Sequence, residues 1–211
     1  MSNLIKLHGV GSDNMHNSRR YFVIPITYED TKDLILNVHY ARRMPSVSYA
    51  FGLYRDNVYG LQGICTFGSP ASPWLCKGVC GEEHKSKVLE LNRVVLVNNR
   101  PNEASLLVAR SIALLPKPKI LVSYADVAQN HIGYVYQATN WLYTGATKPR
   151  TDIATVNGKH PRHHAGDRTK RVFRSAKHRY VFMHGSKKDK RLLTKCLRYG
   201  TESYPKKETI Q

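Results

Sequence analysis

Stretches of β-branched and aromatic residues recur along the chain between clusters of turn-forming residues, and such stretches predict strands. The turn-prone pair Asp56-Asn57 joins two of the stretches and predicts a hairpin. Residues 120–122 are short and continuously apolar, as expected for a strand buried on both faces, and residues 141–143 predict the next strand. The four longer stretches span residues 20–26, 47–55, 58–68 and 88–97.

Helical signals lie between these stretches. Thr27 and Asp30 have the spacing of a capping box and predict a helix that runs to about His39. Apolar residues spaced for one helix face predict a second helix over residues 104–115, and residues 131–140 predict a third. The predicted order is strand, helix, three strands, helix, strand, helix and strand.

Residues 69–84 show little periodicity, and we expect a long, functional loop there. Cys76, Cys80 and His84 place three metal-ligating residue types in or at the end of this segment. A packed loop, a structural zinc site with Cys196 as a distant ligand, and thiol-dependent chemistry all stay open. Because 211 residues contain only four cysteines, we expect reduced thiols rather than a disulfide framework.

The last third of the chain carries most of the net positive charge. The whole chain has 33 Lys and Arg against 15 Asp and Glu, a formal net charge of +18. Residues 146–211 account for +13 of it, interleaved with aromatic residues. Such an excess favours a polyanionic partner. We therefore divide the chain into a catalytic core at residues 1–145 and a basic region at residues 146–211, expected to complete the sheet and bind nucleic acid.

Two classes of protein are disfavoured by composition. With 41% hydrophobic residues, the chain can bury a sizeable core, so a wholly disordered chain is excluded. No apolar run reaches the roughly 18 residues that span a bilayer, and the first residues lack the pattern of a signal peptide. We expect a cytoplasmic protein without membrane association; whether it forms a homodimer stays open.

The order of elements resembles the superfamily of Gcn5-related N-acetyltransferases. In that superfamily, the penultimate helix commonly carries an alanine-x-x-x-tyrosine-x-x-x-glycine-phenylalanine pattern whose tyrosine often serves as general acid. Here Tyr136 lies five residues before Trp141, with Ile132 and Asn140 in place of the alanine and the glycine. The resemblance implies an α/β fold, a single-domain acetyltransferase-like mixed sheet flanked by helices with a basic C-terminal extension. The alternative for Tyr136 is packing against the sheet.

Five phrases of the sequence stand out: HYARRMP at residues 39–45, FGSPASP at 67–73, ELNR at 90–93, SYAD at 123–126 and HIGYVYQA at 131–138. Together they resemble the phage Mom family of DNA-hypermodification proteins. The resemblance implies an enzyme that converts adenine N6 in DNA to N6-carbamoylmethyladenine and so protects phage DNA from restriction, in the cytoplasm of the host cell.

Transfer to adenine N6 needs a base, an acid and an activated donor, because the N6 lone pair is delocalised into the ring. Asp126 follows a buried-looking strand and is expected to accept the N6 proton, with capping of the next helix as the alternative. Tyr136 is the expected acid for the leaving group. His39 is assigned proton transfer or ligation, and a metal site with Asp126 stays open. The full catalytic set is His39, Tyr40, Ser123, Tyr124, Asp126 and Tyr136.

The loop over residues 98–105 departs from the phosphate-binding turn of acyl-coenzyme A enzymes. It has no glycine, Pro101 removes an N–H donor, and Glu103 opposes a bound pyrophosphate. Acyl-coenzyme A is therefore a disfavoured donor. A carbamoylmethyl group is an isomer of a glycyl group, so glycyl-tRNA is the second candidate, with a rearrangement after glycyl transfer. Expected donor contacts are Arg93, Val94, Val95, Asn102, Ala104 and Ser105.

Double-stranded DNA is the expected partner, and tRNA would be a second polyanion. Because N6 is paired in a duplex, we expect the adenine to be extruded, with Tyr40 or Trp141 stacking on it. The alternatives are a non-catalytic nucleic-acid-binding protein and a conventional acyl-coenzyme A N-acetyltransferase. The expected DNA-binding residues are Arg42, Arg43, Lys148, Arg150, Arg168, Lys170, Arg171, Arg174, Lys177 and Arg179.

Overall fold

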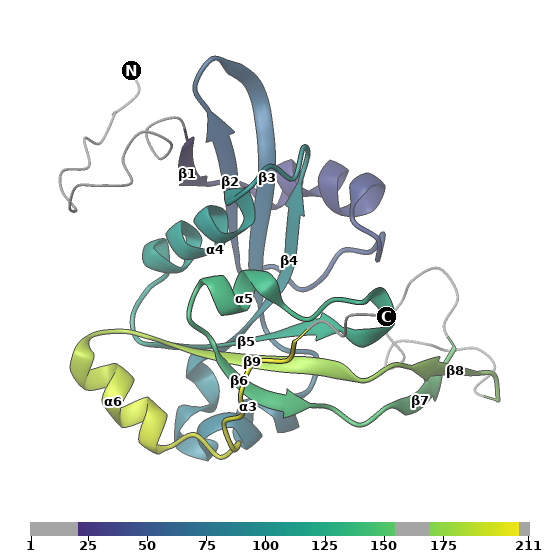
Figure 1. Ribbon diagram of the computed structural model, residues 1–211, viewed down its shortest axis with the longest axis vertical. Coiled ribbons are helices and arrows are strands. Elements are labelled where there is room, and N and C mark those ends of the chain that lie inside the picture. Colours follow the sequence, from purple (N-terminus) through teal and green to yellow (C-terminus); the bar gives the residue numbers. More distant parts are fainter. Residues whose placement is uncertain (1–20, 155–168, 207–211) are drawn as a thin grey trace.

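A seven-stranded sheet forms the centre of the computed structural model, which describes residues 21–154 and 169–206 (Figure 1). The strands lie in the order β1-β2-β3-β4-β5-β9-β6. Neighbouring strands are antiparallel except for β4 and β5, which are parallel. Their bounds are Tyr21–Pro25 (β1), Tyr49–Arg55 (β2), Val58–Gly68 (β3), Val88–Leu96 (β4), Lys119–Asp126 (β5), Leu142–Ala146 (β6) and Lys177–His184 (β9).

A second sheet of two antiparallel strands consists of β7 (Arg150–Ile153) and β8 (Arg171–Arg174). An ion pair between Arg174 and Asp152 joins the two strands. Figure 1 shows this pair extending from one end of β9, at the side of the molecule opposite α6 (Lys187–Lys195).

Helices cover both faces of the main sheet. On one face, α4 (Glu103–Leu114) and α5 (Tyr134–Ala138) pack against the largest core cluster, which includes Phe67, Trp141 and Tyr180. On the other face lie α3 and α6, together with α2 and its π-helical continuation. The remaining bounds are Tyr28–Asp33 (α2), Leu34–Val38 (η1, π-helix), Pro73–Cys80 (α3), Glu82–Lys87 (η2, 3-10) and Val127–Gln129 (η3, 3-10).

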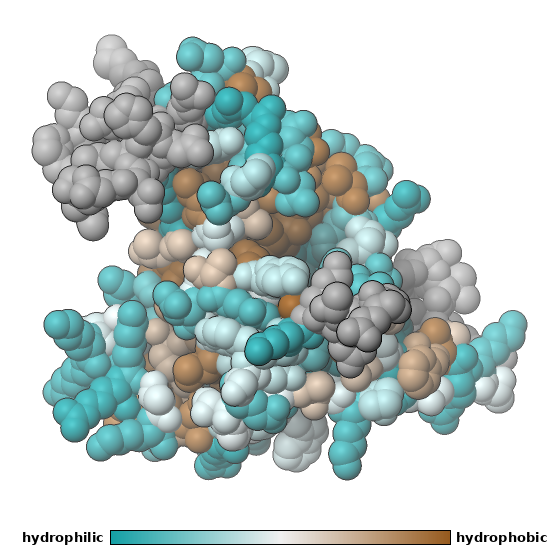
Figure 2. All heavy atoms as spheres, viewed as in Figure 1, coloured by the Kyte–Doolittle hydropathy of each residue, from teal (hydrophilic) through white to brown (hydrophobic). Residues whose placement is uncertain are grey.

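The last helix, α6, shows how charge is kept on the outside of the fold. Leu193 is buried, whereas the lysines of the helix are exposed. Figure 2 shows a hydrophilic surface over α6, at the lower left of the view. Ser186 and Asp189 form a capping box at the start of the helix.

The predicted fold class is confirmed, because a mixed sheet flanked by helices forms a single α/β unit. The predicted hairpin turn at Asp56-Asn57 is present, with Asn57 in the left-handed region. The capping box of Thr27 and Asp30 is also present: the Asp30 N–H donates to the Thr27 hydroxyl, and the Asp30 carboxylate accepts from the Thr27 N–H.

The prediction of a loop over residues 69–84 is wrong, because the segment contains α3 and the start of η2. Leu75, Cys76, Val79 and Cys80 are spaced for one face of a helix, and they pack against the sheet. The stripe is short, so surrounding Gly, Pro and Ser residues obscured it. The helix predicted over residues 131–140 is also shorter, since α5 has only five residues.

The basic C-terminal region contributes to the main sheet, since β9 lies between β5 and β6. Tyr180 and Val181 of this strand are fully buried, one in each of the two larger core clusters. Sequence positions 119–126 and 177–184 thereby become neighbours along their whole length. In the parts of the chain that the structure describes, no helix has the length and apolarity needed to cross a bilayer.

Candidate active site

The two parallel strands of the sheet separate halfway along their length. β4 and β5 pair only from Val88 to Glu90 and from Ile120 to Val122, although both strands continue beyond these residues. A bulge in β4 begins at the same place, because Leu91 pairs with Phe67 but Arg93 pairs with Thr66. An extra residue in a strand bends it away from its neighbour. The bulge therefore opens a gap between the carboxyl ends of β4 and β5.

The extra residue is Asn92, and its side chain holds the bulge in place. Its carbonyl oxygen accepts a 2.6 Å hydrogen bond from the Thr66 hydroxyl, and its amide donates to the Ser46 carbonyl at 2.7 Å. Gly68 lies beside the same carbonyl; a Cβ there would fall 1.8 Å from the Ser46 oxygen, which explains the glycine. The bulge is thus a fixed feature of the site.

A cavity of about 1090 Å³ lies at this gap. Its lining includes Tyr136 from the α4 and α5 face of the sheet, and also Leu75 and Tyr124 from the α3 face. The cavity therefore reaches both faces of the sheet, so two substrates can approach one centre from opposite sides. The predicted site residues that line it are His39, Tyr40, Arg43, Arg93, Val94, Val95, Ala104, Tyr124, Tyr136, Lys148, Arg150, Arg174 and Lys177.

Ser123 and Tyr136 form a hydrogen-bonded chain across the gap. The Ser123 hydroxyl lies 2.7 Å from the Leu91 carbonyl and 2.7 Å from the Tyr136 hydroxyl. Because a carbonyl can only accept, Ser123 donates its single proton to Leu91 when that bond is made, and Tyr136 then donates to Ser123. Rotation of the Ser123 hydroxyl reverses the second bond and lets Ser123 donate to the tyrosine oxygen.

Tyr136 is almost fully buried, against the rings of Trp141 and Tyr180. Burial raises its pKa above the usual tyrosine value, so the phenol is protonated at neutral pH. The predicted role as a proton donor and the alternative of packing against the sheet are therefore both compatible with its position. Tyr136 belongs to the short helix α5 and lines the cavity.

Glu90 brings a carboxylate into the cavity from the last paired position of β4. It forms no hydrogen bond or ion pair with another described residue, although Arg93 and Lys177 are near enough to influence its charge. Burial raises the pKa of Glu90 above its ordinary value, and these two cations oppose the shift. An unpaired carboxylate with a raised pKa is the kind of group that accepts a proton in catalysis.

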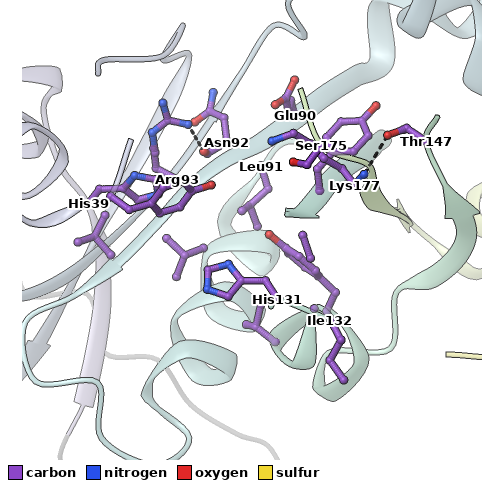
Figure 3. Close-up of a pocket in the computed structure, with 18 of the residues that line it drawn as sticks. His39, Glu90, Leu91, Asn92, Arg93, His131, Ile132, Thr147, Ser175 and Lys177 are labelled. Atoms are coloured by element: carbon purple, nitrogen blue, oxygen red, sulfur yellow. Dashed lines mark hydrogen bonds between the residues drawn. The ribbon is translucent and has the colours of Figure 1, made fainter. Parts of the chain in front are cut away.

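A second group of ring side chains borders the cavity. His39 stacks on Tyr40 at 4.4 Å between centroids, and Tyr40 meets the edge of His131 at 6.1 Å. Burial, with the charges of Arg93 and His131, lowers the pKa of His39 to about 4, so this ring is neutral at pH 7. Its Nδ1 accepts from the Ala41 N–H at 3.0 Å, which places the ring proton on Nε2. Figure 3 shows His39 and Arg93 on one side of the pocket and Lys177 on the other.

Asp126 lies at the end of β5 but does not line the cavity. Lys177 pairs with its carboxylate at 2.8 Å, the Ser175 hydroxyl donates to it at 2.5 Å, and the Ala128 N–H donates at 3.0 Å. Burial raises the pKa of Asp126, but the bonds from Lys177 and Ser175 outweigh it and hold the pKa below the ordinary value. The geometry therefore favours the alternative interpretation, in which Asp126 caps η3 and ties it to β9.

The predicted DNA-binding residues differ in where they lie relative to the cavity. Arg43, Lys148, Arg150, Arg174 and Lys177 border the cavity, and all but Lys177 are exposed. Exposed residues away from the cavity lining are Arg42, Lys170 and Arg171, while Arg168 lies outside the described residues.

Arg179 is held within the fold rather than presented to a ligand. Its guanidinium lies 3.5 Å from the centroid of the Tyr199 ring and donates to the hydroxyl and carbonyl of Thr144.

Comparison with known proteins identifies the chain. The Mom protein family matches residues 20–206. The chain belongs to the Mom family. Among curated proteins, no match was found.

Solved acetyltransferases are similar in fold to this Mom-family chain. A GNAT-family acetyltransferase from Bacillus cereus has a TM-score of 0.44 at 10% identity, covering 77% of this chain and 96% of its own. NAA60 of Arabidopsis thaliana, solved with acetyl-CoA, has a TM-score of 0.48 at 12% identity, covering 77% and 98%. Spermidine N-acetyltransferase SpeG from Vibrio cholerae has 0.45 at 9%, covering 79% and 95%.

The start of α4 is where an acyl-coenzyme A enzyme would hold the pyrophosphate. Glu103 is buried there, and its carboxylate accepts from the Arg100 N–H at 2.9 Å and from the Tyr21 hydroxyl at 2.8 Å. The Mom-family chain thus places its own anion at the helix start, so these residues do not fit a pyrophosphate. Of the predicted donor contacts, Asn102 and Ser105 line a separate cavity of about 410 Å³ between α4 and α5.

Arg93, another predicted donor contact, already binds backbone carbonyls of the protein itself. Its two terminal nitrogens donate to the backbone carbonyls of Asn92 and Arg43, at 2.6 and 2.9 Å. Figure 3 shows the bond to Asn92. Arg93 therefore connects the bulge in β4 to the segment that follows His39.

One predicted role is wrong, and two site residues were missed. Trp141 cannot stack on an extruded base, because its side chain is fully buried in the core. Glu90 and His131 line the cavity but were absent from the predicted site. Their signal was their place in the Mom-like phrases over residues 90–93 and 131–138.

A metal site at His39 and Asp126, which the sequence left open, gains no support from the geometry. Asp126 is engaged by Lys177 and Ser175, while His39 stacks on Tyr40. Around neither residue do the described side chains assemble a group of three metal-ligating atoms.

Proposed function

We propose that this Mom-family protein is a transferase that modifies adenine N6 in DNA, using Glu90 as base and Tyr136 as acid. The observation that carries the proposal is the unpaired carboxylate of Glu90 in a cavity that passes through the gap between β4 and β5. The specific activity that we propose is the conversion of adenine in phage DNA to N6-carbamoylmethyladenine, in the cytoplasm of the host cell.

DNA approaches from the side of β7 and β8. Lys148, Arg150 and Arg174 lie there at the border of the cavity and supply charge for the phosphates. An adenine extruded from the duplex enters the cavity and stacks on Tyr40, which is 57% exposed. Extrusion is required because N6 cannot react freely while the adenine is paired.

The reaction needs two proton movements. As N6 attacks the donor carbonyl and the new N–C bond forms, Glu90 accepts a proton from N6. As the bond from the carbonyl to the leaving group breaks, Tyr136 gives its proton to the departing oxygen or sulfur. Ser123 then rotates its hydroxyl from the Leu91 carbonyl to the Tyr136 oxygen and stabilises the phenolate.

Glycyl-tRNA is the donor that we propose, and acyl-coenzyme A is the alternative. Glu103 at the start of α4 disfavours a pyrophosphate, whereas an aminoacyl ester needs no such site. Transfer of glycine to N6 gives a glycyl adduct with the same atoms as a carbamoylmethyl group. An internal rearrangement then breaks the N6–carbonyl and Cα–amine bonds and forms N6–Cα and carbonyl–amine bonds. No atom is gained or lost, and the product is the carbamoylmethyl amide.

The proposed activity is tested in DNA from cells that express the chain. Enzymatic digestion and mass spectrometry of the nucleosides should reveal a modified deoxyadenosine that is missing when the empty vector is used. Unmodified adenine in DNA from cells with abundant folded protein would contradict the proposal.

The donor is tested with purified protein, duplex DNA and tRNA charged with isotopically labelled glycine. We expect label in adenine only while the charged tRNA is intact, so ribonuclease treatment should remove it. Label from acetyl-coenzyme A in place of glycine would show a conventional use of that cofactor and overturn the glycyl-tRNA proposal.

A further inference from the structure

A group of metal-ligating side chains lies outside the candidate active site, since none of its members lines the cavity. One ligand atom each from Glu83, His84 and Cys196 lies within 4.8 Å of the others. Glu83 and His84 belong to η2, and Cys196 caps the end of α6. Glu83 and His84 are adjacent in the sequence, but Cys196 follows 112 positions after His84, so only the fold brings it to them.

His84 gives the clearest sign of a ligand. It is 7% exposed, and its Nε2 is buried without a hydrogen bond to any described residue. Nε2 lies 3.1 Å from a Glu83 carboxylate oxygen but lacks hydrogen-bond geometry with it. Two ligands bound to one tetrahedral zinc at about 2.0–2.2 Å lie roughly 3.3 Å apart, so this spacing suits a shared ion.

Hydrogen bonds already join α3, which precedes η2, to α6 and the residues that follow it. The Arg198 N–H donates to the Val79 carbonyl at 2.9 Å, and the Cys80 thiol donates to the Leu193 carbonyl at 3.7 Å. Gly81, with φ of +94°, turns the chain between α3 and η2. The ligand set is therefore held without the metal, which lowers the entropic cost of binding an ion.

We propose that Glu83, His84 and Cys196 bind a zinc ion that joins η2 to the end of α6. A thiolate, an imidazole and a carboxylate form a ligand set suited to Zn²⁺, with water in the fourth position. On binding, the Cys196 thiol releases its proton to solvent. The Cys80 thiol stays on the Leu193 carbonyl and is not a ligand.

Lys87 opposes the ion in the metal-free protein. Its ammonium lies 3.0 Å from Nδ1 of His84 and can only donate, so the ring proton sits on Nε2. Zinc at Nε2 requires this proton on Nδ1, and Lys87 must then turn toward solvent. Removal of Lys87 should therefore strengthen binding.

The site is tested by titration of metal-free protein with Zn²⁺ against a chromogenic chelator. We expect one ion per chain in the wild type and at least a tenfold weaker affinity in His84→Ala and Cys196→Ser. Cys76→Ser is the matched control, because its thiol lies outside the group and the variant should bind like the wild type. Equal zinc affinity in the wild type and Cys196→Ser would overturn the proposal, as would absence of binding to the wild type.

A second measurement separates loss of the ligand from loss of the fold. Co²⁺ in place of zinc should give a thiolate-to-metal charge-transfer band in the wild type that Cys196→Ser lacks, while both proteins unfold cooperatively on heating. Lys87→Met should bind Zn²⁺ more tightly than the wild type. A cobalt spectrum without a thiolate band in the wild type, or weaker binding in Lys87→Met, would contradict the assigned ligands.

Discussion

The hydroxyl oxygens of Ser123 and Tyr136 lie 2.7 Å apart at the gap between β4 and β5, and Ser123 also reaches the Leu91 carbonyl. A buried phenol beside a second hydroxyl that can reverse its bond is suited to lose and regain a proton. Tyr136 lines the cavity and both side chains are buried, so catalysis and packing depend on the same two residues.

Tyr136→Phe should lower the rate of base modification by ~10²–10⁴-fold, the range expected for loss of a general acid. Ser123→Ala should give a smaller loss, because the proton donor remains but its phenolate is less stabilised. Tyr143→Phe is the matched control, since the Tyr143 hydroxyl contacts His178 at 2.9 Å and does not line the cavity. Yields of modified nucleoside measured over time would show the difference, and equal losses in all three variants would contradict the assignment.

Asp126 is expected to stabilise the fold rather than accept the substrate proton. Asp126→Asn should lower the free energy of unfolding by about 1.5–3 kcal/mol at pH 7, as for a lost hydrogen bond to a charged group. Because the folded-state pKa of Asp126 is lowered, its contribution is present above the unfolded pKa and is lost as the pH falls through the folded value. Denaturant unfolding at several pH values should therefore show the two proteins converging in acid.

The same variant distinguishes the two roles of Asp126. If the residue acts only through Lys177 and Ser175, folded Asp126→Asn loses far less activity than the ~100-fold expected for a missing base. A larger loss in a protein that remains folded would restore Asp126 as the proton acceptor.

The pattern of hydrophobic and polar residues predicted those helices and turns whose signals lie within a few residues of one another. Thr27 and Asp30 are three residues apart, so their capping box could be recognised from spacing alone. The helix α3 was missed because its buried stripe is short and its burial depends on contact with β4, β5 and α6. Along β5, Tyr124 packs with the cluster on the α3 side, whereas Ser123 reaches Tyr136 on the other face, as the alternation of side chains along a strand requires.

Site residues were harder to predict because their partners are distant in sequence. Asp126 looked free at the end of a strand, but Lys177, 51 positions later, occupies its carboxylate. Glu90 looked like an ordinary polar position of a strand, since nothing nearby in sequence shows that β4 and β5 separate after it. The bulge at Asn92 depends on Thr66 and Ser46, which the pattern of β4 does not reveal.

The exposed cationic side chains at the border of the cavity should increase the affinity for DNA by attracting its phosphates. Lys148→Gln with Arg174→Gln should weaken duplex binding and reduce the salt slope of log K by about 2, the amount expected for two lost phosphate contacts. Lys187→Gln with Lys188→Gln on α6 is the control of equal charge, away from the cavity. Binding titrations at several salt concentrations test this, and equal slopes in both double variants would contradict the location of the DNA.

The pH dependence of modification should report on Glu90. Only its carboxylate can accept a proton, so the rate should rise with pH through the raised pKa of this group. The acidic limb of the rate profile should therefore lie above about 4.3, the ordinary pKa of glutamate. A profile that is flat down to that pH would show that the base is another group.

The most direct test of the account is the fraction of modified adenine in DNA from cells that express Glu90→Gln. The substitution keeps the size of the side chain but removes the carboxylate. We predict loss of the modified nucleoside with soluble, folded protein and unchanged DNA affinity, whereas the exposed control Glu29→Gln should modify DNA like the wild type. Wild-type levels of modification with Glu90→Gln would contradict the central claim that Glu90 is the base.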